Sequence, residues 1–306
     1  MKIAIVGGAG KMGIWLARQL LCEPLEVILV DSHAMRLSVA SSELKIVGTT
    51  DLKAVANADI VLLALPITTF ADNIKELSSI LQPSQTVMDI TSVKVMTVNA
   101  MHKYFPSCLV LGAHPVFGPG AQSWQKQNVI LTPTSDEETK FANKIRFWLE
   151  ERGAHVETMS PAEHDHAMSV VLGLAHFIAI VSGDTLLHQT EMQEMQPLSS
   201  VTFRLLMTLV GSVISEDPSL YASIQTHLTE LPELEKDFIS RAQEWADLVV
   251  NKDSTTFAER MAELKPLLSK WAPDSEKSYR NMYRIDQQDQ ETRPKYPGDN
   301  AIVERD

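Results

Sequence analysis

Residues 2–13 read KIAIVGGAGKMG, an apolar β-strand pattern that runs directly into a glycine-rich turn. Within this stretch, Gly8, Gly10 and Gly13 form a GxGxxG motif, and a helical pattern begins after Gly10. Glycines at these positions permit a tight turn, the close approach of a pyrophosphate and close packing of helix on strand. The N–H groups at the helix N-terminus attract anionic phosphate. The stretch predicts a dinucleotide-binding turn, with a turn that binds no ligand as the alternative.

Further residues are predicted to complete the cofactor site. Lys11 and Met12 lie inside the motif, and Leu65 and Pro66 directly follow the strand predicted at residues 60–64. In a sheet of parallel strands, the carboxyl ends of neighbouring strands meet at one edge, where ligands bind. These four residues are therefore predicted to bind the cofactor.

Asp31 ends the next apolar run, residues 27–30. An acidic side chain at this position accepts hydrogen bonds from the ribose hydroxyls of the cofactor, which favours NAD over NADP. Two observations keep alternatives open: nearby His33 and Arg36 leave room for a 2′-phosphate, and Asp31 also fits a solvated turn.

The first half of the chain alternates short apolar runs with amphipathic stretches, which is the pattern of an α/β domain. Such alternation favours a parallel sheet, because parallel strands need crossover connections. The predicted strands are residues 2–6, 27–30, 60–64, 86–90, 108–111, 128–132 and 155–157. The predicted helices of this half are residues 11–21, 69–80 and 137–151.

The pattern changes after Met159. Ser160, Pro161 and Glu163 combine a capping serine, a proline at the first helical position and a glutamate three residues after the cap, which predicts a helix start. From there helical periodicity dominates, with helices expected at residues 161–188, 197–214, 219–228, 232–251 and 254–271. We predict an α/β nucleotide-binding domain at 1–159 and an all-helical domain at 160–272.

Residues 273–306 form a polar, proline-punctuated tail. Because it lacks apolar periodicity, the tail is expected to be extended or disordered. The alternative is that Tyr279, Met282, Tyr283 and Ile285 dock it on the helical domain.

Composition excludes several classes of protein. The 306 residues carry a formal net charge of −12, so the basic surface that binds nucleic acid is not expected. The two cysteines, Cys22 and Cys108, lack CxxC spacing, which indicates neither a disulfide framework nor a structural zinc site. No run of about 18 consecutive apolar residues occurs, so a soluble cytoplasmic protein without a membrane span is predicted.

Candidate catalytic residues follow two predicted strands. His114 stands in GAHPVFGPG, residues 112–120, and a histidine there can take a proton from a hydroxyl whose carbon loses hydride. The alternative is a loop histidine bonded to backbone. Ser92 could bind a substrate hydroxyl or the nicotinamide end, or could equally cap a helix, while Asp89 and Lys94 are assigned to loop structure.

The helix that begins at Pro161 carries further polar side chains. At 100° per residue, Asp165, Met168, Leu172 and His176 fall on one face, which is predicted to face the cleft. His164 and His176 lie too far apart along the helix axis to hold one small ligand together. The sequence His164-Asp165-His166 is not a metal site, because adjacent helix residues point in different directions.

Five separated segments of the chain carry a recognisable pattern. They are GGAGKMG, DITSVK, AHPVFGPG, EHDHAMSVVLGLAHF and LSSVTFRLLMTLVGSVISEDPSLYASI. Together, and in this order along the chain, they resemble the prephenate dehydrogenase family. The resemblance spans roughly residues 1–270. It implies a Rossmann domain followed by a helical dimerisation domain, and therefore a homodimer.

The resemblance also implies an activity. The family oxidises the ring 4-hydroxyl of prephenate with NAD⁺ or NADP⁺, and loss of CO₂ yields 4-hydroxyphenylpyruvate for tyrosine synthesis. By this resemblance His114 is the catalytic histidine and Ser92 shares the hydroxyl with it. His176 matches a histidine of the substrate pocket, and His164 matches one whose role is mainly structural.

One position departs from the family pattern. The arginine that binds a substrate carboxylate corresponds here to Ser212, which cannot form a bidentate ionic contact. Arg204, two helical turns upstream, is the predicted replacement, with an ion-pair role or a basic residue of a second subunit as alternatives. A different substrate is the further alternative.

Three other functions stay open. The first is an arogenate or amino-substituted prephenate dehydrogenase, which the missing arginine keeps possible. The second is another dehydrogenase with the same layout, against which the absence of an interdomain lysine in residues 170–177 argues. The third is a catalytically silent dinucleotide sensor, which would need neither Ser92 nor His114. Hydride transfer to a nicotinamide needs no metal, and none is predicted.

Overall fold

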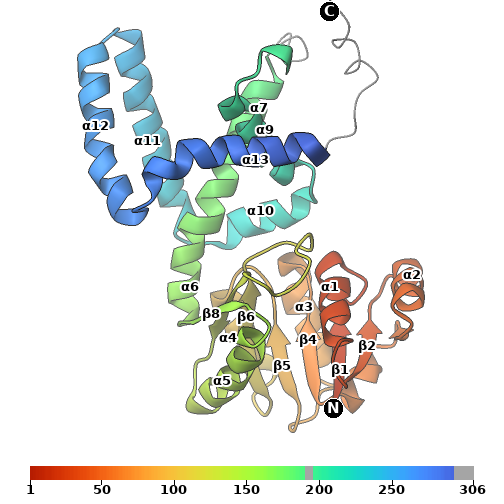
Figure 1. Cartoon of the computed structure of the whole chain (residues 1–306). Helices are drawn as coiled ribbons and strands as arrows, with labels where there is room; N and C mark the ends of the chain where they lie inside the picture. Colours follow the sequence, from red (N-terminus) through yellow and green to blue (C-terminus); the bar gives the residue numbers. More distant parts are fainter. Residues whose placement is uncertain (190–195, 293–306) are drawn as a thin grey trace, which may run out of the picture. The chain divides into compact units, whose positions relative to one another are not determined.

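The computed structural model describes residues 1–189 and 196–292 (Figure 1). It divides into two compact units, of which the first joins Met1–Gly173 with Pro218–Leu231. The second unit joins Leu174–Asp217 with Pro232–Asp306. The first unit extends beyond the predicted boundary at Met159, because two helices of the helical half pack on the nucleotide-binding half. These are α6 (Pro161–Met168), which contacts α4, and α10 (Pro218–His227), which contacts α3.

An eight-stranded sheet in the order β3-β2-β1-β4-β5-β6-β7-β8 forms the centre of the first unit. Its strands are β1 (Lys2–Val6), β2 (Glu26–Val30), β3 (Val47–Thr49), β4 (Ile60–Leu63), β5 (Thr86–Asp89), β6 (Leu109–Pro115), β7 (Asn128–Thr132) and β8 (His155–Thr158). The predicted strands are confirmed, but the expectation of a parallel sheet is wrong at one pair. β7 runs antiparallel to β6, because residues 116–127 between them contain no crossover helix.

Helices cover both faces of this sheet. One face packs against α1 (Lys11–Leu20), α2 (Ala34–Leu44) and α5 (Asp136–Glu150). The other packs against α3 (Ile67–Leu77), α4 (Val95–Tyr104) and the short helix η1 (Leu52–Asn57). β1 shows the alternation, since Ile3 and Ile5 enter the first core cluster and Ala4 and Val6 the second.

Several elements of this unit were not predicted from the sequence. Among them are β3, α2, α4 and the short helix η1. Leu37 and Ala40 are the buried residues of α2, so its sequence carries a weak apolar period. β3 is a three-residue edge strand with no buried residue. Each element is therefore specified more by its neighbours than by its own pattern.

The helix predicted at 161–188 begins as expected and is then interrupted. The Ser160 side chain accepts from the Glu163 N–H, and the Glu163 carboxylate accepts from the Ser160 N–H, which confirms the capping box. After α6, a π-helix of six residues, Ser169–Leu174, precedes α7 (Ala175–Leu187). A π-helix has more residues per turn than an α-helix. The predicted alignment of Asp165 with His176 on one face therefore does not follow from α-helical spacing.

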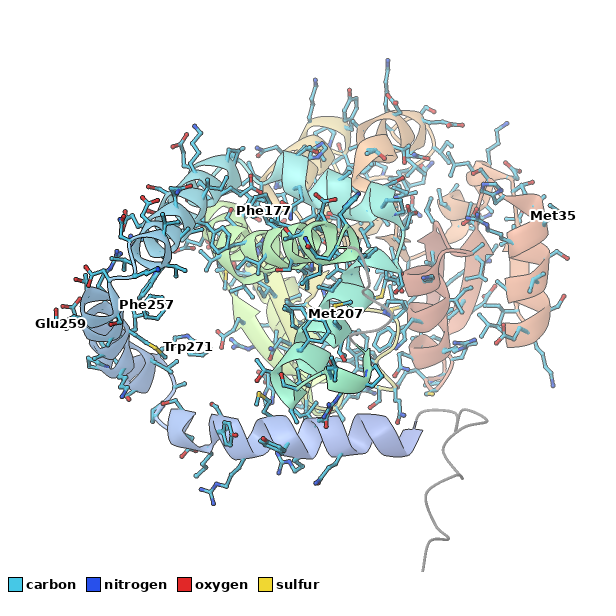
Figure 2. The ribbon with its side chains drawn as sticks, turned by 90° about the horizontal axis from the view of Figure 1, so that it is seen from above. Met35, Phe177, Met207, Phe257, Glu259 and Trp271 are labelled. Carbon is cyan, nitrogen blue, oxygen red and sulfur yellow. The ribbon has the colours of Figure 1, made fainter. Side chains whose placement is uncertain are left out.

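Within its described residues, the second unit contains helices, turns and loops and no β-strand. Besides α7 it contains α9 (Val201–Ile214), α11 (Leu231–Val250), α12 (Ser254–Trp271) and α13 (Ser278–Thr292), together with the short helices η3 (Gln196–Leu198) and η4 (Ser275–Lys277). α7 and α9 pack together so closely that a Cβ on Gly183 of α7 would collide with the side chains of Val210 and Ile214. Trp271 of α12, labelled in Figure 2, has an exposed fraction of 84%.

The polar tail contains a helix. The expectation of an extended tail is wrong for α13, which contacts α9. Met282 contributes to this contact, since its sulfur lies 3.9 Å from the Thr202 hydroxyl. Tyr279 and Tyr283, in contrast, are exposed, and their rings pack edge to face against each other. Residues 293–306 lie outside the described part of the chain.

One helical run within the described residues, Pro161–Leu187, is long and apolar enough to cross a membrane. Its mean hydropathy is 1.9, and 17% of the apolar window is buried. Length and composition are the sole basis for this property, and an apolar helix that packs against protein has the same composition.

Candidate active site

The glycine turn joins β1 to α1 with an open helix N-terminus. No side chain caps α1, whose N-cap is Gly10. Gly7 has φ +78°, a conformation that favours glycine, and a Cβ on it would collide with the Ala64 carbonyl. A Cβ on Gly13 would collide with the Gly7 carbonyl oxygen. The turn therefore has the shape that a dinucleotide pyrophosphate requires. Gly7 was missed in the motif, although the double glycine signals it.

Asp31 is bound to this turn. It follows β2, is half-buried, and its Oδ2 accepts from the Ala9 N–H at 3.0 Å. Its Oδ1 accepts from the His33 N–H at 2.9 Å. A carboxylate retains acceptor capacity beyond these two bonds, so its oxygens can also accept from ribose hydroxyls.

The other predicted cofactor residues lie at the same edge of the sheet. Leu65 is half-buried and follows β4, and Pro66 is the N-cap of α3. Lys11 is exposed and Met12 half-buried at the start of α1. β4 pairs with β1, so the two strand ends are adjacent. The residues predicted to bind the cofactor are thus brought together, and their contacts with it stay predictions.

His114 lies at the penultimate position of β6 and is 3% exposed. Its Nδ1 is 2.9 Å from Nε2 of His164 on α6. Burial, followed by the charges of His164 and Lys94, holds the pKa of His114 well below its ordinary value. His114 is therefore neutral at physiological pH, which is the state of a general base. The contact with His164 was not predicted, since 50 residues separate the two histidines.

His164 is itself fully buried and bonded to its neighbour. Its Nδ1 lies 2.7 Å from Oδ1 of Asp165. Burial lowers the pKa of His164, and the hydrogen bond to Asp165 opposes this effect. Asp165, His164 and His114 thus form a continuous hydrogen-bonded chain within the first unit.

Asp165 also caps α4. Its Oδ1 accepts from the Lys94 N–H at 2.7 Å, and its Oδ2 accepts from the Val95 N–H at 2.9 Å. A carboxylate at a helix N-terminus is favoured by the free N–H groups and by the helix dipole. The alternative that Ser92 caps this helix is wrong, because the N-cap residue is Lys94 and the capping group comes from α6.

Ser92 lies in the loop between β5 and α4 and is half-buried. Its hydroxyl makes no hydrogen bond to any described residue. β5 and β6 are neighbours, with Asp89 opposite Gly112, so Ser92 and His114 follow the same edge of the sheet. A shared substrate hydroxyl between them stays a prediction.

Lys94 and Asp89 form a buried ion pair beneath the site, and both side chains are 0% exposed. Asp89 also accepts from the Thr97 hydroxyl at 2.6 Å, and Lys94 Nζ donates to the Ala113 carbonyl at 2.8 Å. Burial lowers the pKa of Lys94 and the charge of Asp89 opposes this effect. The predicted loop role for this pair is consistent with these bonds, which anchor the residue before His114.

His176 and Arg204 both lie in the second unit. His176 is half-buried on α7, and burial lowers its pKa. The Arg204 guanidinium binds Asp286 of α13 through two bonds, at 2.7 and 2.6 Å, and the Ser199 carbonyl at 2.6 Å. Ser212 is exposed and donates to the Leu209 carbonyl. The roles of His176 and Arg204 in substrate binding remain predictions.

Residues 1–189 and 196–292 contain no group of three or more His, Cys, Asp or Glu side chains placed to hold a metal ion. In the sequence His164-Asp165-His166, the first two side chains are buried, whereas His166 is exposed and bonds Glu230. The three side chains therefore do not converge.

Two family models match the chain. Residues 16–158 match the model described as prephenate dehydrogenase, nucleotide-binding domain. Residues 160–263 match the model described as prephenate dehydrogenase, dimerization domain.

Individual proteins agree with these matches. The "Probable arogenate/prephenate dehydrogenase" of Methanocaldococcus jannaschii is 33% identical over 267 residues, which cover 86% of this chain and 60% of that protein. The chain thus spans about three fifths of the length of this relative. The 4-amino-4-deoxyprephenate dehydrogenase of Streptomyces pristinaespiralis is 22% identical, over 92% of this chain and 96% of that protein.

Among solved structures, the prephenate dehydrogenase of A. aeolicus in complex with hydroxyphenyl propionate and NAD⁺ is similar, with a TM-score of 0.74. It is 26% identical, and the match covers 88% of this chain and 98% of that one. The family models account for both halves of the chain, from the helix after the glycine turn to the middle of α12. The chain therefore belongs to the prephenate dehydrogenase family.

Proposed function

We propose that this protein oxidises prephenate, or a close analogue, with a nicotinamide dinucleotide, in a reaction that also releases CO₂. The observation that carries the proposal is His114, a histidine buried at the cofactor edge of the sheet and hydrogen-bonded through one ring nitrogen. Burial holds its pKa well below the ordinary value, which favours the neutral ring. A base in this state can accept the proton of a hydroxyl while the carbon that bears it loses hydride.

The reaction balances without an outside proton. His114 takes the proton of the ring 4-hydroxyl as C4 loses its hydride, and Ser92 donates a hydrogen bond to the same oxygen. The cofactor, when bound, accepts the hydride. Loss of the ring carboxylate as CO₂ leaves its electron pair in the ring, which becomes aromatic. The proton on His114 then returns to the oxygen, and the product is 4-hydroxyphenylpyruvate.

NAD is the cofactor that Asp31 favours. The Asp31 carboxylate accepts from the Ala9 N–H of the glycine turn, beside the position expected for the adenosine ribose of the cofactor. A 2′-phosphate there would face a negative charge, so NADP would bind more weakly.

A carboxylate of the substrate needs a cation, and Ser212 cannot supply it. Arg204 is the predicted cation, yet it already binds Asp286. Prephenate, arogenate and 4-amino-4-deoxyprephenate all carry the same two carboxylates, so the contact of Arg204 with Asp286 does not distinguish them, and all three are candidate substrates. A silent dinucleotide sensor is the second candidate class, and the chain of His114, His164 and Asp165 favours the enzyme, since a sensor has no use for a positioned base.

A homodimer through the helical half is proposed on two grounds. The family model for this half is described as a dimerization domain. The half also carries exposed apolar side chains on several helices; these include Val181, Leu187, Leu209, Ile214, Leu264, Leu267 and Trp271. A cytoplasmic setting remains a prediction.

A substrate panel tests the function. Prephenate, arogenate and 4-amino-4-deoxyprephenate are each mixed with NAD⁺ and with NADP⁺, and reduced cofactor is followed by absorbance. We expect turnover with at least one substrate, faster with NAD⁺. His114→Asn should retain cofactor binding and lose most turnover. Failure of all six combinations would refute the enzymatic assignment.

A further inference from the structure

We propose that His164 and Asp165 are positioning residues that fix the tautomer of His114, so that its Nε2 carries the lone pair facing the substrate hydroxyl. This inference rests on the proposed function, because it assigns how the base of that reaction is held ready. Neither residue is predicted to touch substrate or cofactor.

The direction of each hydrogen bond follows from the chemistry of its two ends. Asp165 is a carboxylate that already accepts two backbone N–H groups, so at the 2.7 Å contact it accepts and His164 Nδ1 donates. A neutral imidazole carries one proton, so the Nε2 of His164 is an acceptor. At the 2.9 Å contact His114 Nδ1 therefore donates, and its Nε2 is unprotonated.

The surroundings keep this arrangement neutral. The titratable groups that face the pair are Lys94, at the start of α4, Asp89 of β5 and Asp165 of α6. His114 is 3% exposed and His164 0%, so a positive charge on either ring would lack solvation. With both rings neutral, the anionic carboxylate at one end orients every proton along the chain.

The Asp165 carboxylate also connects His114 to the segment that carries Ser92, the loop between β5 and α4. Asp165 holds the N-terminus of α4 through Lys94 and Val95, immediately after the loop that carries Ser92. One side chain of α6 thus determines both the tautomer of His114 and the position of the helix that follows Ser92. If His164 had only a structural role, it would not need a hydrogen bond to His114.

Two substitutions at His164 separate this role from simple packing. His164→Leu fills the buried space but offers no acceptor, so the His114 proton moves to Nε2, which can then no longer act as a base. We expect kcat to fall about 100-fold, within the contribution of a general base, with the KM for cofactor unchanged. His164→Gln places an amide oxygen and an amide NH₂ near the two ring nitrogens, and should restore most of kcat.

His166 supplies the matched control. It lies two positions further on α6, and its side chain is 68% exposed and bonds Glu230. His166→Leu removes a histidine from the same helix and leaves the hydrogen bonds among His114, His164 and Asp165 intact. It should keep kcat within about twofold, as expected for a surface position.

The tautomer is read directly by ¹⁵N NMR of the whole protein labelled at its histidine rings. Protonated and unprotonated ring nitrogens resonate far apart, and the His114 signals are assigned by their loss in His114→Asn. We expect protonated Nδ1 and unprotonated Nε2 in the wild-type protein and in His164→Gln, and the reverse in His164→Leu.

The two readouts separate the inference from the proposed function. Protonated Nε2 in wild-type His114 would overturn the inference, as would a His164→Leu variant with wild-type tautomer and kcat. If His164→Leu does not fold, the wild-type spectrum alone decides. If no substrate of the panel turns over, the proposed function fails, and the spectrum still shows whether Asp165 and His164 set the tautomer.

Discussion

The Lys94–Asp89 pair offers the sharpest test of what holds the site together. Both side chains are 0% exposed, so the lysine cannot be removed without leaving a buried carboxylate opposite an apolar group. Breaking such a pair costs about 3–5 kcal/mol. In Lys94→Met, Asp89 keeps two other donors, the Thr91 N–H at 2.8 Å and the Thr97 hydroxyl at 2.6 Å. We therefore expect the substitution to lower the free energy of unfolding by about 3–4 kcal/mol, the lower part of this range.

Thermal unfolding followed by circular dichroism measures this cost. At about 2–4 °C per kcal/mol for a unit of this size, Lys94→Met should lower Tm by about 6–16 °C. Lys236→Met is the matched control, because it removes a lysine from an exposed pair whose side chains are 71% and 79% exposed. Its effect should stay below about 1 kcal/mol.

A double variant tests why Lys94→Met loses stability. In Lys94→Met/Asp89→Asn, the new amide can accept from the Thr91 N–H and donate to the Thr97 hydroxyl, and no buried charge remains. The double variant should therefore be more stable than Lys94→Met alone. A Lys94→Met protein with unchanged Tm, or a double variant less stable than the single one, would refute the assignment of a buried ion pair.

Three further predictions concern the cofactor turn and the base. Gly13→Ala should weaken NAD binding about 10-fold or more by calorimetry, because the added Cβ meets two backbone groups of the glycine turn. Gly211→Ala, whose Cβ has open space around it, is the control and should leave NAD binding unchanged. Equal NAD affinities of the two variants would contradict the need for a glycine at position 13. Asp31→Ala should weaken NAD binding about 10-fold and narrow the preference over NADP, and an unchanged Kd would remove Asp31 from the ribose site. Because the pKa of His114 lies well below 6.5, kcat/KM should stay level from neutral pH to below 6.5 and fall only when His114 takes up a proton at more acidic pH; a fall centred at 6.5 or above would show a differently placed base.

Much of the nucleotide-binding half was predictable because its signals are local. A glycine with positive φ, an apolar strand and a helix start each depend on residues a few positions apart. His114 and Ser92 were found as polar residues after apolar runs, and parallel strands bring such positions to one edge. The elements that were missed, such as α2 and α4, have weak periods of their own and form because a sheet face must be covered.

Several contacts of the predicted site residues, in each unit separately, depend on packing between distant segments. His114 and His164 are 50 residues apart, Lys94 and Asp165 are 71 apart, and Arg204 and Asp286 are 82 apart. No local pattern marks these pairs, and α-helical spacing is misleading across the π-helix that follows α6. The sequence by itself determined the family, the cofactor turn and the residue that we propose as base. Only the tertiary structure decided which side chains lie against that residue, because burial removes water as a partner and leaves each polar group to the neighbour that the fold places beside it.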